Sequence, residues 1–114
     1  RRSSRLQRDV SLGLTQINWT HEFDYVTEDG LSLDMAQPGS KCGIEVDGPS
    51  HYLKNPTTGA WVVDGSTRLK SRLLEARGWS IVCIPFFEWN CRTADERASY
   101  LECKLETARI LGAT

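Results

Sequence analysis

The chain has 114 residues, of which 39% are hydrophobic and 25% are charged, a balance typical of one globular domain. No apolar run reaches the ~18 residues that a membrane-spanning helix needs, so we expect a soluble domain without a membrane partner. The first eight residues carry four arginines and no acid, whereas the remaining 106 carry ten basic and fifteen acidic residues. This balance excludes a general polyanion binder, so binding to nucleic acid requires a local basic patch.

The chain begins at Arg1 rather than Met and shows no signal-peptide core, so we interpret it as a piece of a longer protein. We expect a single domain over 1–114, with an N-terminal helix in 1–15 and the core in 16–114. The four cysteines form no CxxC pair and there are only two histidines, which argues against a tetrahedral zinc site. Reduced, buried thiols are the favoured interpretation, and a disulfide framework is the alternative.

Hydrophobic periodicity predicts an α/β domain with the element order α-β-β-β-α-β-α. The segments are a helix at 5–14, alternating strands at 17–25, 31–35 and 42–47, a long loop at 48–65, a helix at 67–77, a buried strand at 79–85 and a last helix opened by a capping box at 93–96. This order predicts a mixed four-stranded sheet flanked by helices.

Two helices are expected to cover the core. In the helix at 67–77, Ser66 is the expected N-cap, and Leu69, Leu73 and Ala76 are expected to point inward. The last helix is expected to end before Gly112 and to bury one face, made of Ala94, Ala98, Leu101, Leu105 and Ala108.

Three acidic residues are expected on one face of the sheet. If the turn at 37–40 sets Ala36 opposite Lys41, Leu33 faces Ile44 and Asp34 faces Gly43. Glu45 is then a diagonal neighbour of Asp34, at roughly 7–8 Å between backbones. In this register Asp34, Glu45 and Asp47 share one face, and the aliphatic residues of both strands share the other.

Carboxylates that converge in this way need a divalent cation, basic partners or raised pKa values. Oxygen ligands favour Mg²⁺ or Mn²⁺, so a metal site at Asp34, Glu45 and Asp47 is one interpretation. The alternative is a solvated strand face whose acids pair with lysine and arginine. We expect no zinc and no organic cofactor.

Three motifs occur in order: IEVDGPSHYL at 44–53, GSTRLKSRLLEARGW at 65–79 and IPFFEW at 84–89. Together they resemble the RAP domain over about residues 17–108. RAP domains are RNA-associated domains at the C-terminal end of mitochondrial and chloroplast RNA-processing proteins, including the FAST-kinase family and apicomplexan proteins. The resemblance implies the C-terminal part of a larger organellar protein.

RAP domains look like distant relatives of the PD-(D/E)XK nucleases, so the resemblance also implies a restriction-endonuclease-like core. In that superfamily an Asp on the second strand and an acid on the third bind metal, and a Lys two residues later positions water. Asp34 and Glu45 match the two acids, but Asp47 stands in place of the lysine. An aspartate cannot stabilise charge as an ammonium does, so cleavage is in doubt. Lys70 is the best substitute for that lysine, which makes Asp34, Glu45, Asp47 and Lys70 the catalytic candidates.

Several residues are candidates for RNA contacts. His51 and Tyr52 follow a turn and are placed to line the same cleft, although a loop-packing role for His51 is the alternative. Trp61 either stacks on a base or covers the edge of the core. The other candidates are basic: Lys54 in the loop, Arg68, Lys70 and Arg72 on the following helix, and the cluster from Arg1 to Arg8. A solvated side chain is the alternative for Lys54, and an exposed helix face toward the parent protein is the alternative for the arginine cluster.

Three functional hypotheses follow from these residues. The first is an RNA-binding domain, located in mitochondria or chloroplasts, that serves RNA processing, stability, translation or ribosome assembly. The second is a Mg²⁺- or Mn²⁺-dependent endoribonuclease. The third is a structural module that packs against helical repeats or ribosomal proteins.

Overall fold

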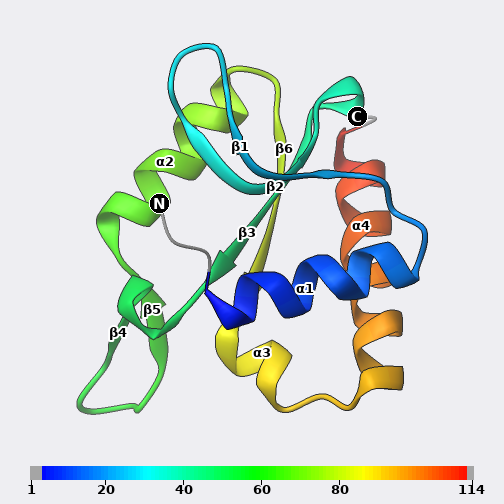
Figure 1. Cartoon of the computed structure of the whole chain (residues 1–114). Helices are drawn as coiled ribbons and strands as arrows, with labels where there is room; N and C mark the ends of the chain where they lie inside the picture. The colour runs from blue at the N-terminus through cyan, green and yellow to red at the C-terminus, as the bar shows by residue number, and fades with distance from the viewer. Residues whose placement is uncertain (1–3, 113–114) are drawn as a thin grey trace.

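The computed structural model describes residues 4–112 and, within them, the side chains of residues 4–109. Its centre is a four-stranded mixed sheet in the order β1-β2-β3-β6 (Figure 1). Strands β1 (Glu22–Val26), β2 (Ser32–Gln37) and β3 (Cys42–Asp47) form an antiparallel meander, and β6 (Ser80–Pro85) pairs in parallel with β3. The predicted mixed α/β architecture with a four-stranded sheet is confirmed. Arg1 and Arg2 of the arginine cluster lie outside the described residues.

Helices cover both faces of this sheet. Helices α1 (Arg5–Gln16) and α4 (Ala94–Gly112) close one apolar cluster, whose buried members are Val10, Leu14, Met35, Ile44, Val46, Val82, Ile84, Trp89 and Leu101. Helix α2 (Gly65–Ala76) closes the second cluster, which holds Leu33, Ala36, Leu74 and Trp79. Figure 1 shows α2 and α4 on opposite sides of the strands. None of the helices within residues 4–112 combines the length and the hydropathy of a membrane-spanning segment.

The first strand is shorter than predicted, because residues 17–21 end helix α1 instead of joining the sheet. Asn18 adopts a left-handed conformation with φ 64°. The backbone N–H groups of Asn18 and Trp19 donate to the carbonyls of Thr15 and Leu14. These bonds satisfy the last carbonyls of the helix. The two N–H groups are therefore not available for pairing with β2, and the strand begins only at Glu22.

The segment 48–65, predicted as a loop, contains secondary structure. A short 3₁₀ helix (Pro49–His51) leads into a two-stranded hairpin of β4 (Tyr52–Lys54) and β5 (Trp61–Val63). Asn55 closes the hairpin turn, because its side-chain Oδ1 accepts from the backbone N–H groups of Thr57 and Thr58. The strands are only three residues long, too short for periodicity to reveal them. Helix α3 (Phe86–Asn90) is similarly short and lies outside the predicted order.

Helix α2 turns a different face inward from the one predicted. Its N-cap is Asp64 rather than Ser66, and the inward face holds Thr67, Lys70, Ser71 and Leu74. Leu69 is 58% exposed and Leu73 is 37% exposed, and Ala76 is exposed as well. The prediction assumed that the most apolar stripe of the helix faces the core. Instead, the ion pair between Lys70 and Glu45 of β3 turns the Lys70 side chain toward the sheet.

The capping box of Thr93 and Glu96 at the start of α4 is confirmed. Leu101 is buried, while Ala98, Leu105 and Ala108 are half-buried. Ala94 is exposed, contrary to the prediction. Side chains of a helix lean toward its N-terminus, so a residue in the first turn points past the start of the helix. Gly112 is the last residue of α4 rather than the residue after it.

The register of β2 against β3 differs by two residues from the predicted one. The observed pairs are Met35 with Ile44, Ala36 with Gly43, and Gln37 with Cys42. A 3₁₀ turn (Pro38–Ser40) followed by Lys41 at φ 53° makes the connection and sets this register. The regular pairs end at Met35 and Ile44, one residue before Asp34 and Glu45 would meet.

Strand β2 also fails to keep its aliphatic residues on one face. Leu33 packs with α2 in the second cluster, whereas Met35 packs in the first cluster with α1 and α4. Residues two apart on a regular strand share a face, so the strand is irregular at Asp34. In β1, Asp24 lies between the partners of Leu33 and Met35 and has φ 58°. The irregularity therefore spans both strands and turns the Asp34 side chain into the interior, where it is 2% exposed.

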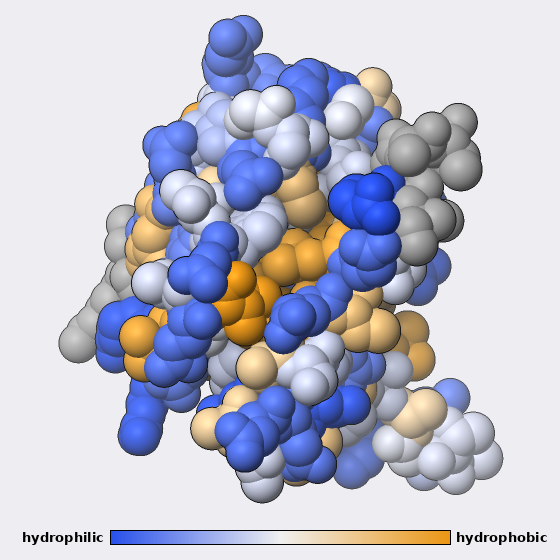
Figure 2. Space-filling model, turned by 90° about the vertical axis from the view of Figure 1, so that its right-hand side faces the viewer, coloured by the Kyte–Doolittle hydropathy of each residue, from blue (hydrophilic) through white to orange (hydrophobic). Residues whose placement is uncertain are grey.

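A groove of about 680 Å³ lies near the amino ends of β3 and β6. Its apolar lining includes Trp19, Cys42 and Leu105, and Figure 2 shows hydrophobic residues in a hollow bordered by hydrophilic ones. The three acids lie toward the opposite end of the sheet, and none of the predicted site residues lines this groove.

Gly43 leaves room on the face of the sheet for the side chains of Leu33 and Ile81. A Cβ atom at Gly43 would lie 2.8 Å from both Cδ atoms of Leu33. We therefore expect Gly43→Ala to lower the free energy of unfolding, measured by urea denaturation, by about 1–3 kcal/mol. Gly39→Ala is the matched control, because a Cβ atom added at Gly39 would meet nothing within 4 Å. Equal stabilities of the two variants would contradict this account of the packing.

Candidate functional site

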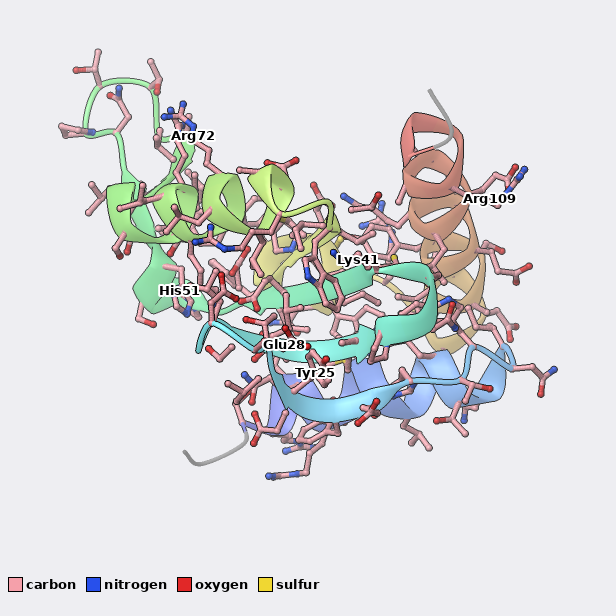
Figure 3. The ribbon with its side chains drawn as sticks, turned by 90° about the horizontal axis from the view of Figure 1, so that it is seen from above. Tyr25, Glu28, Lys41, His51, Arg72 and Arg109 are labelled. Atoms are coloured by element: carbon pink, nitrogen blue, oxygen red, sulfur yellow. The ribbon has the colours of Figure 1, made fainter. Side chains whose placement is uncertain are left out.

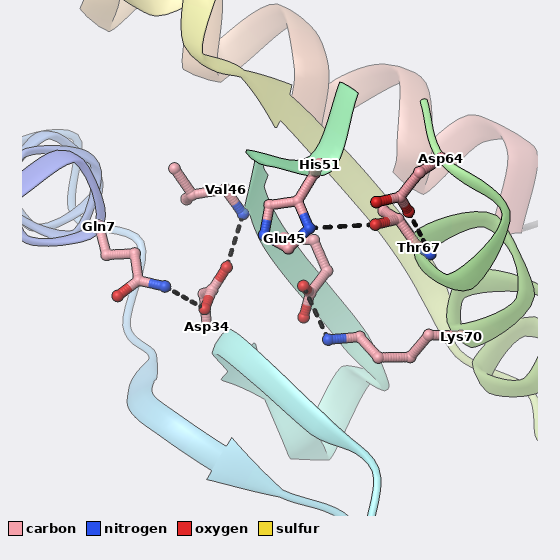
Figure 4. Close-up of polar contacts among 8 residues, drawn as sticks. All are labelled: Gln7, Asp34, Glu45, Val46, His51, Asp64, Thr67 and Lys70. Carbon is pink, nitrogen blue, oxygen red and sulfur yellow. Dashed lines mark hydrogen bonds and ion pairs between the residues drawn. The ribbon is translucent and has the colours of Figure 1, made fainter. Parts of the chain in front are cut away.

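Asp34 joins three elements at the irregular point of the sheet. Its Oδ1 accepts a hydrogen bond from Gln7 Nε2 of α1 at 2.6 Å, and its Oδ2 accepts from the backbone N–H of Val46 in β3 at 2.7 Å (Figure 4). The Val46 N–H thus gains a side-chain acceptor in place of a backbone carbonyl of the ladder. Both carboxylate oxygens of Asp34 are engaged in holding α1 and β3 to β2.

Glu45 forms a partly buried ion pair with the helix that covers it. Its Oε2 lies 2.9 Å from Nζ of Lys70, and the side chains are 7% and 28% exposed. The other oxygen, Oε1, is buried and has no hydrogen-bond partner among the described residues. Burial and the charge of Asp34 raise the pKa of Glu45 to about 7, against the opposing effect of the Lys70 ammonium.

Asp47, at the end of β3, is 2% exposed and lies opposite Pro85 of β6. Burial raises its pKa to about 6, while the charge of His51 acts in the opposite direction. Two of the three acids therefore bind a proton at a higher pH than an exposed carboxyl group does, because the fold removes them from water.

His51 connects the 3₁₀ turn to the start of α2. Its Nδ1 lies 3.1 Å from Oγ1 of Thr67, and its carbonyl accepts from the N–H of Asp64 at 2.8 Å. Asp64 Oδ1 in turn accepts from the N–H of Thr67 at 2.8 Å and so caps the helix. Figure 4 shows the contacts of Thr67 with His51 and Asp64 beside the ion pair of Glu45 and Lys70.

The arrangement does not fit a three-carboxylate metal site. Within residues 4–109, no three His, Cys, Asp or Glu side chains are grouped closely enough to hold a metal ion. Both oxygens of Asp34 already accept hydrogen bonds, and Glu45 is bound to Lys70. Metal binding at Asp34, Glu45 and Asp47 stays a prediction that no contact here supports.

The structure separates the basic candidates into two groups. Lys70 reaches the acids and forms an ion pair with Glu45. It lies on the flank of α2 that also carries Arg77. Arg68 and Arg72 are exposed on the other flank, and Lys54 is exposed at the end of β4. Figure 3 shows His51 and Arg72 at one end of the molecule and Arg109 at the other.

The sequence analysis did not identify two residues that build the site, Gln7 and Asp64. Gln7 is 8% exposed and binds Asp34, and it also forms a capping box with Ser4. The S-x-x-Q spacing at 4–7 is a recognisable helix-start signal, but it does not reveal a contact 27 residues away. Asp64 is readable as an N-cap for the same reason, three residues before Thr67.

Comparison with known proteins places these elements in a family. A family model described as the RAP domain matches residues 44–104, from β3 through the hairpin, α2, β6 and α3 into α4. Over 96% of its length the chain is 34% identical to a "RAP domain-containing protein, chloroplastic" from Oryza sativa subsp. japonica. The chain spans 16% of the length of that relative. The resemblance based on the three sequence motifs is confirmed.

Loss of the Asp34 carboxylate should destabilise the fold. Asp34→Ala leaves the buried N–H of Val46 and the amide of Gln7 without their acceptor, so we expect the free energy of unfolding to fall by about 3 kcal/mol. Asp9→Ala, at an exposed position of α1, is the control and should change it by less than roughly 0.5 kcal/mol. A fully stable Asp34→Ala protein would show that these two bonds do not hold the sheet together.

Stability should also depend on pH. A carboxyl group whose pKa is raised on folding stabilises the fold below its unfolded pKa, and this stabilisation is lost as pH rises through the folded pKa. For Glu45 the free energy of unfolding should fall by about 3 kcal/mol as the pH rises from about 4.5 to about 7. Asp47 acts in the same direction between about 3.8 and about 6.

The measurement is urea unfolding between pH 4.5 and 8. Glu45→Gln keeps an acceptor for Lys70 and should flatten the decline, whereas Glu106→Gln, at an exposed position of α4, should leave it unchanged. The same slope in wild type and Glu45→Gln would exclude Glu45 as the titrating group.

Proposed function

Because the chain belongs to the RAP domain family, we propose that it is an RNA-binding domain of an organellar protein acting in RNA processing, stability, translation or ribosome assembly. The observation that carries this proposal is the family match over 44–104, which covers the hairpin and the exposed flank of α2. The name of the rice relative, which includes "chloroplastic", supports an organellar location. The restriction-endonuclease-like relationship of the core is a further proposal, consistent with a mixed sheet between helices.

The proposed RNA surface consists of Lys54, Arg68, Arg72 and the ring of His51. All four side chains are exposed, and the three cations have no acidic partner among residues 4–109. Four other cations of the described chain have such partners: Lys70 with Glu45, Arg77 with Asp29, Lys104 with Glu88 and Arg109 with Glu106. Lys41, Arg92 and Arg97 donate to backbone carbonyls instead. Lys54, Arg68 and Arg72 can therefore bind a phosphate without first breaking an ion pair with a carboxylate, so this surface can bind RNA although most of the domain is acidic.

The contacts of the buried acids favour binding over cleavage. Asp34 stabilises the irregular point of the sheet, and Lys70 neutralises Glu45. We therefore assign Lys70 to the support of the fold rather than to direct RNA contact. The metal-dependent endoribonuclease remains the weaker proposal, because Asp34 is bound to Gln7 and Val46, and Glu45 is bound to Lys70.

A second role is compatible with the first and rests on a separate observation. Leu69 and Leu73 lie four residues apart on α2 and are 58% and 37% exposed. Exposed leucines at this spacing form a stripe that a helix of a larger protein or assembly can cover. We propose that this stripe packs against helical repeats or ribosomal proteins.

RNA affinity should depend on the two free arginines of α2. We expect Arg68→Ala/Arg72→Ala to weaken binding of a single-stranded RNA by roughly 10- to 30-fold at 0.1 M salt, and to lower the slope of log affinity against log salt by about 1.4, because two phosphate contacts are lost. Fluorescence anisotropy at several salt concentrations measures both quantities. Lys104→Ala/Arg109→Ala makes the same charge change on α4 and should leave both nearly unchanged.

The same titration with Mg²⁺ or Mn²⁺ present, followed by gel analysis of RNA length, separates the hypotheses. We expect the RNA to stay intact. Metal-dependent shortening would replace the binding proposal with the nuclease, and a wild-type protein that binds no RNA would leave only the packing role.

A further inference from the structure

Four aromatic residues meet beside the proposed RNA surface. Tyr52 comes from β4, Trp61 from β5, and Phe86 and Phe87 from α3. Their ring centroids lie 5.2–6.5 Å apart in every pairing. We call this group the aromatic corner. It attaches the hairpin to the domain, because β4 and β5 form a separate two-stranded sheet.

The topology explains why these segments meet. Strands β3 and β6 are parallel and Asp47 pairs with Pro85, so the chain leaves both strands at the same edge of the sheet. After β3 it forms the turn that carries His51 and then the hairpin; after β6 it continues directly into Phe86. Figure 1 shows the β4–β5 hairpin extending from this edge, away from α1 and α4.

Trp61 is the accessible member of the corner. It is 38% exposed, whereas Tyr52, Phe86 and Phe87 are half-buried. The ring of Phe87 lies nearly parallel to the Trp61 ring at 11° and 6.4 Å, and the ammonium of Lys54 lies 5.1 Å from the Trp61 ring centroid. A cation over an exposed ring is held by only about 0.5–1 kcal/mol, so a flat ligand can displace it.

We propose that the exposed ring of Trp61 stacks on one unpaired base of single-stranded RNA, with Lys54 moving from the ring to the neighbouring phosphate. This inference rests on the proposed RNA binding and adds the form of RNA that is recognised. Bases inside a duplex have both faces covered by their neighbours, so only an unpaired base can offer a face to Trp61. The three other aromatic rings hold the Trp61 ring in place, which limits the conformational entropy lost on stacking.

The first test compares affinities for a single-stranded RNA and for an RNA duplex of the same length. We expect wild type to prefer the single strand, and Trp61→Leu to weaken single-strand binding about 10-fold with little effect on the duplex. Trp61→Phe keeps an aromatic face and should retain most of the affinity. Trp19→Leu, in the groove at the other end of the sheet, is the control and should bind as wild type does.

The second test uses fluorescence, so it does not require that Trp61→Leu keep the hairpin folded. The chain has four tryptophans. Single-stranded RNA should quench part of the emission of wild type and of Trp19→Phe. The quench should disappear in Trp61→Phe while the RNA still binds, because the phenylalanine cannot report the stacking.

The outcomes separate this inference from the one on which it rests. No binding of either RNA form overturns both. Binding without a preference for the single strand, or an unchanged quench in Trp61→Phe, overturns the stacking role alone and leaves RNA binding through Arg68 and Arg72 intact.

Discussion

The hydrogen bond from the Val46 N–H to the Asp34 carboxylate is the contact on which the rest of the structure depends. At this point β2 departs from regular alternation, so a backbone donor of β3 takes a side-chain acceptor. Gln7 binds the other oxygen of the same carboxylate and thereby positions α1 on the sheet. An apolar residue at position 34 would leave both donors unpaired in the interior, where a missing hydrogen bond is costly.

This constraint changes how the acidic residues are interpreted. Carboxylates on neighbouring strands suggest catalysis when they face solvent together. Here the Asp34 carboxylate accepts a hydrogen bond from the backbone of β3, Glu45 forms an ion pair with Lys70, and Asp47 is buried at the end of β3. Loss of activity in an Asp34 variant would therefore report on folding before it reported on chemistry.

The same contacts explain which cations are left for a ligand. Because Lys70 is drawn inward, α2 presents Arg68 and Arg72 to solvent beside two exposed leucines. The hairpin adds Lys54 and Trp61 at the same edge of the sheet, beside α3. An acidic body thus gains a local surface that combines positive charge with an aromatic face, which is the combination that single-stranded nucleic acid requires.

The sequence by itself determined the strands of the four-stranded sheet, apart from the start of the first, because periodicity is a local property. It also placed three helices within a few residues of the observed α1, α2 and α4, although not their exact ends. It also determined the family, through three motifs, and singled out Lys70 as the substitute for the motif lysine, which the structure pairs with Glu45. The register of β2 and β3, the inward face of α2 and the hairpin were decided by tertiary structure. Each depends on a contact between distant residues, as with Gln7 and Asp34 or Glu45 and Lys70, which no spacing along the chain encodes.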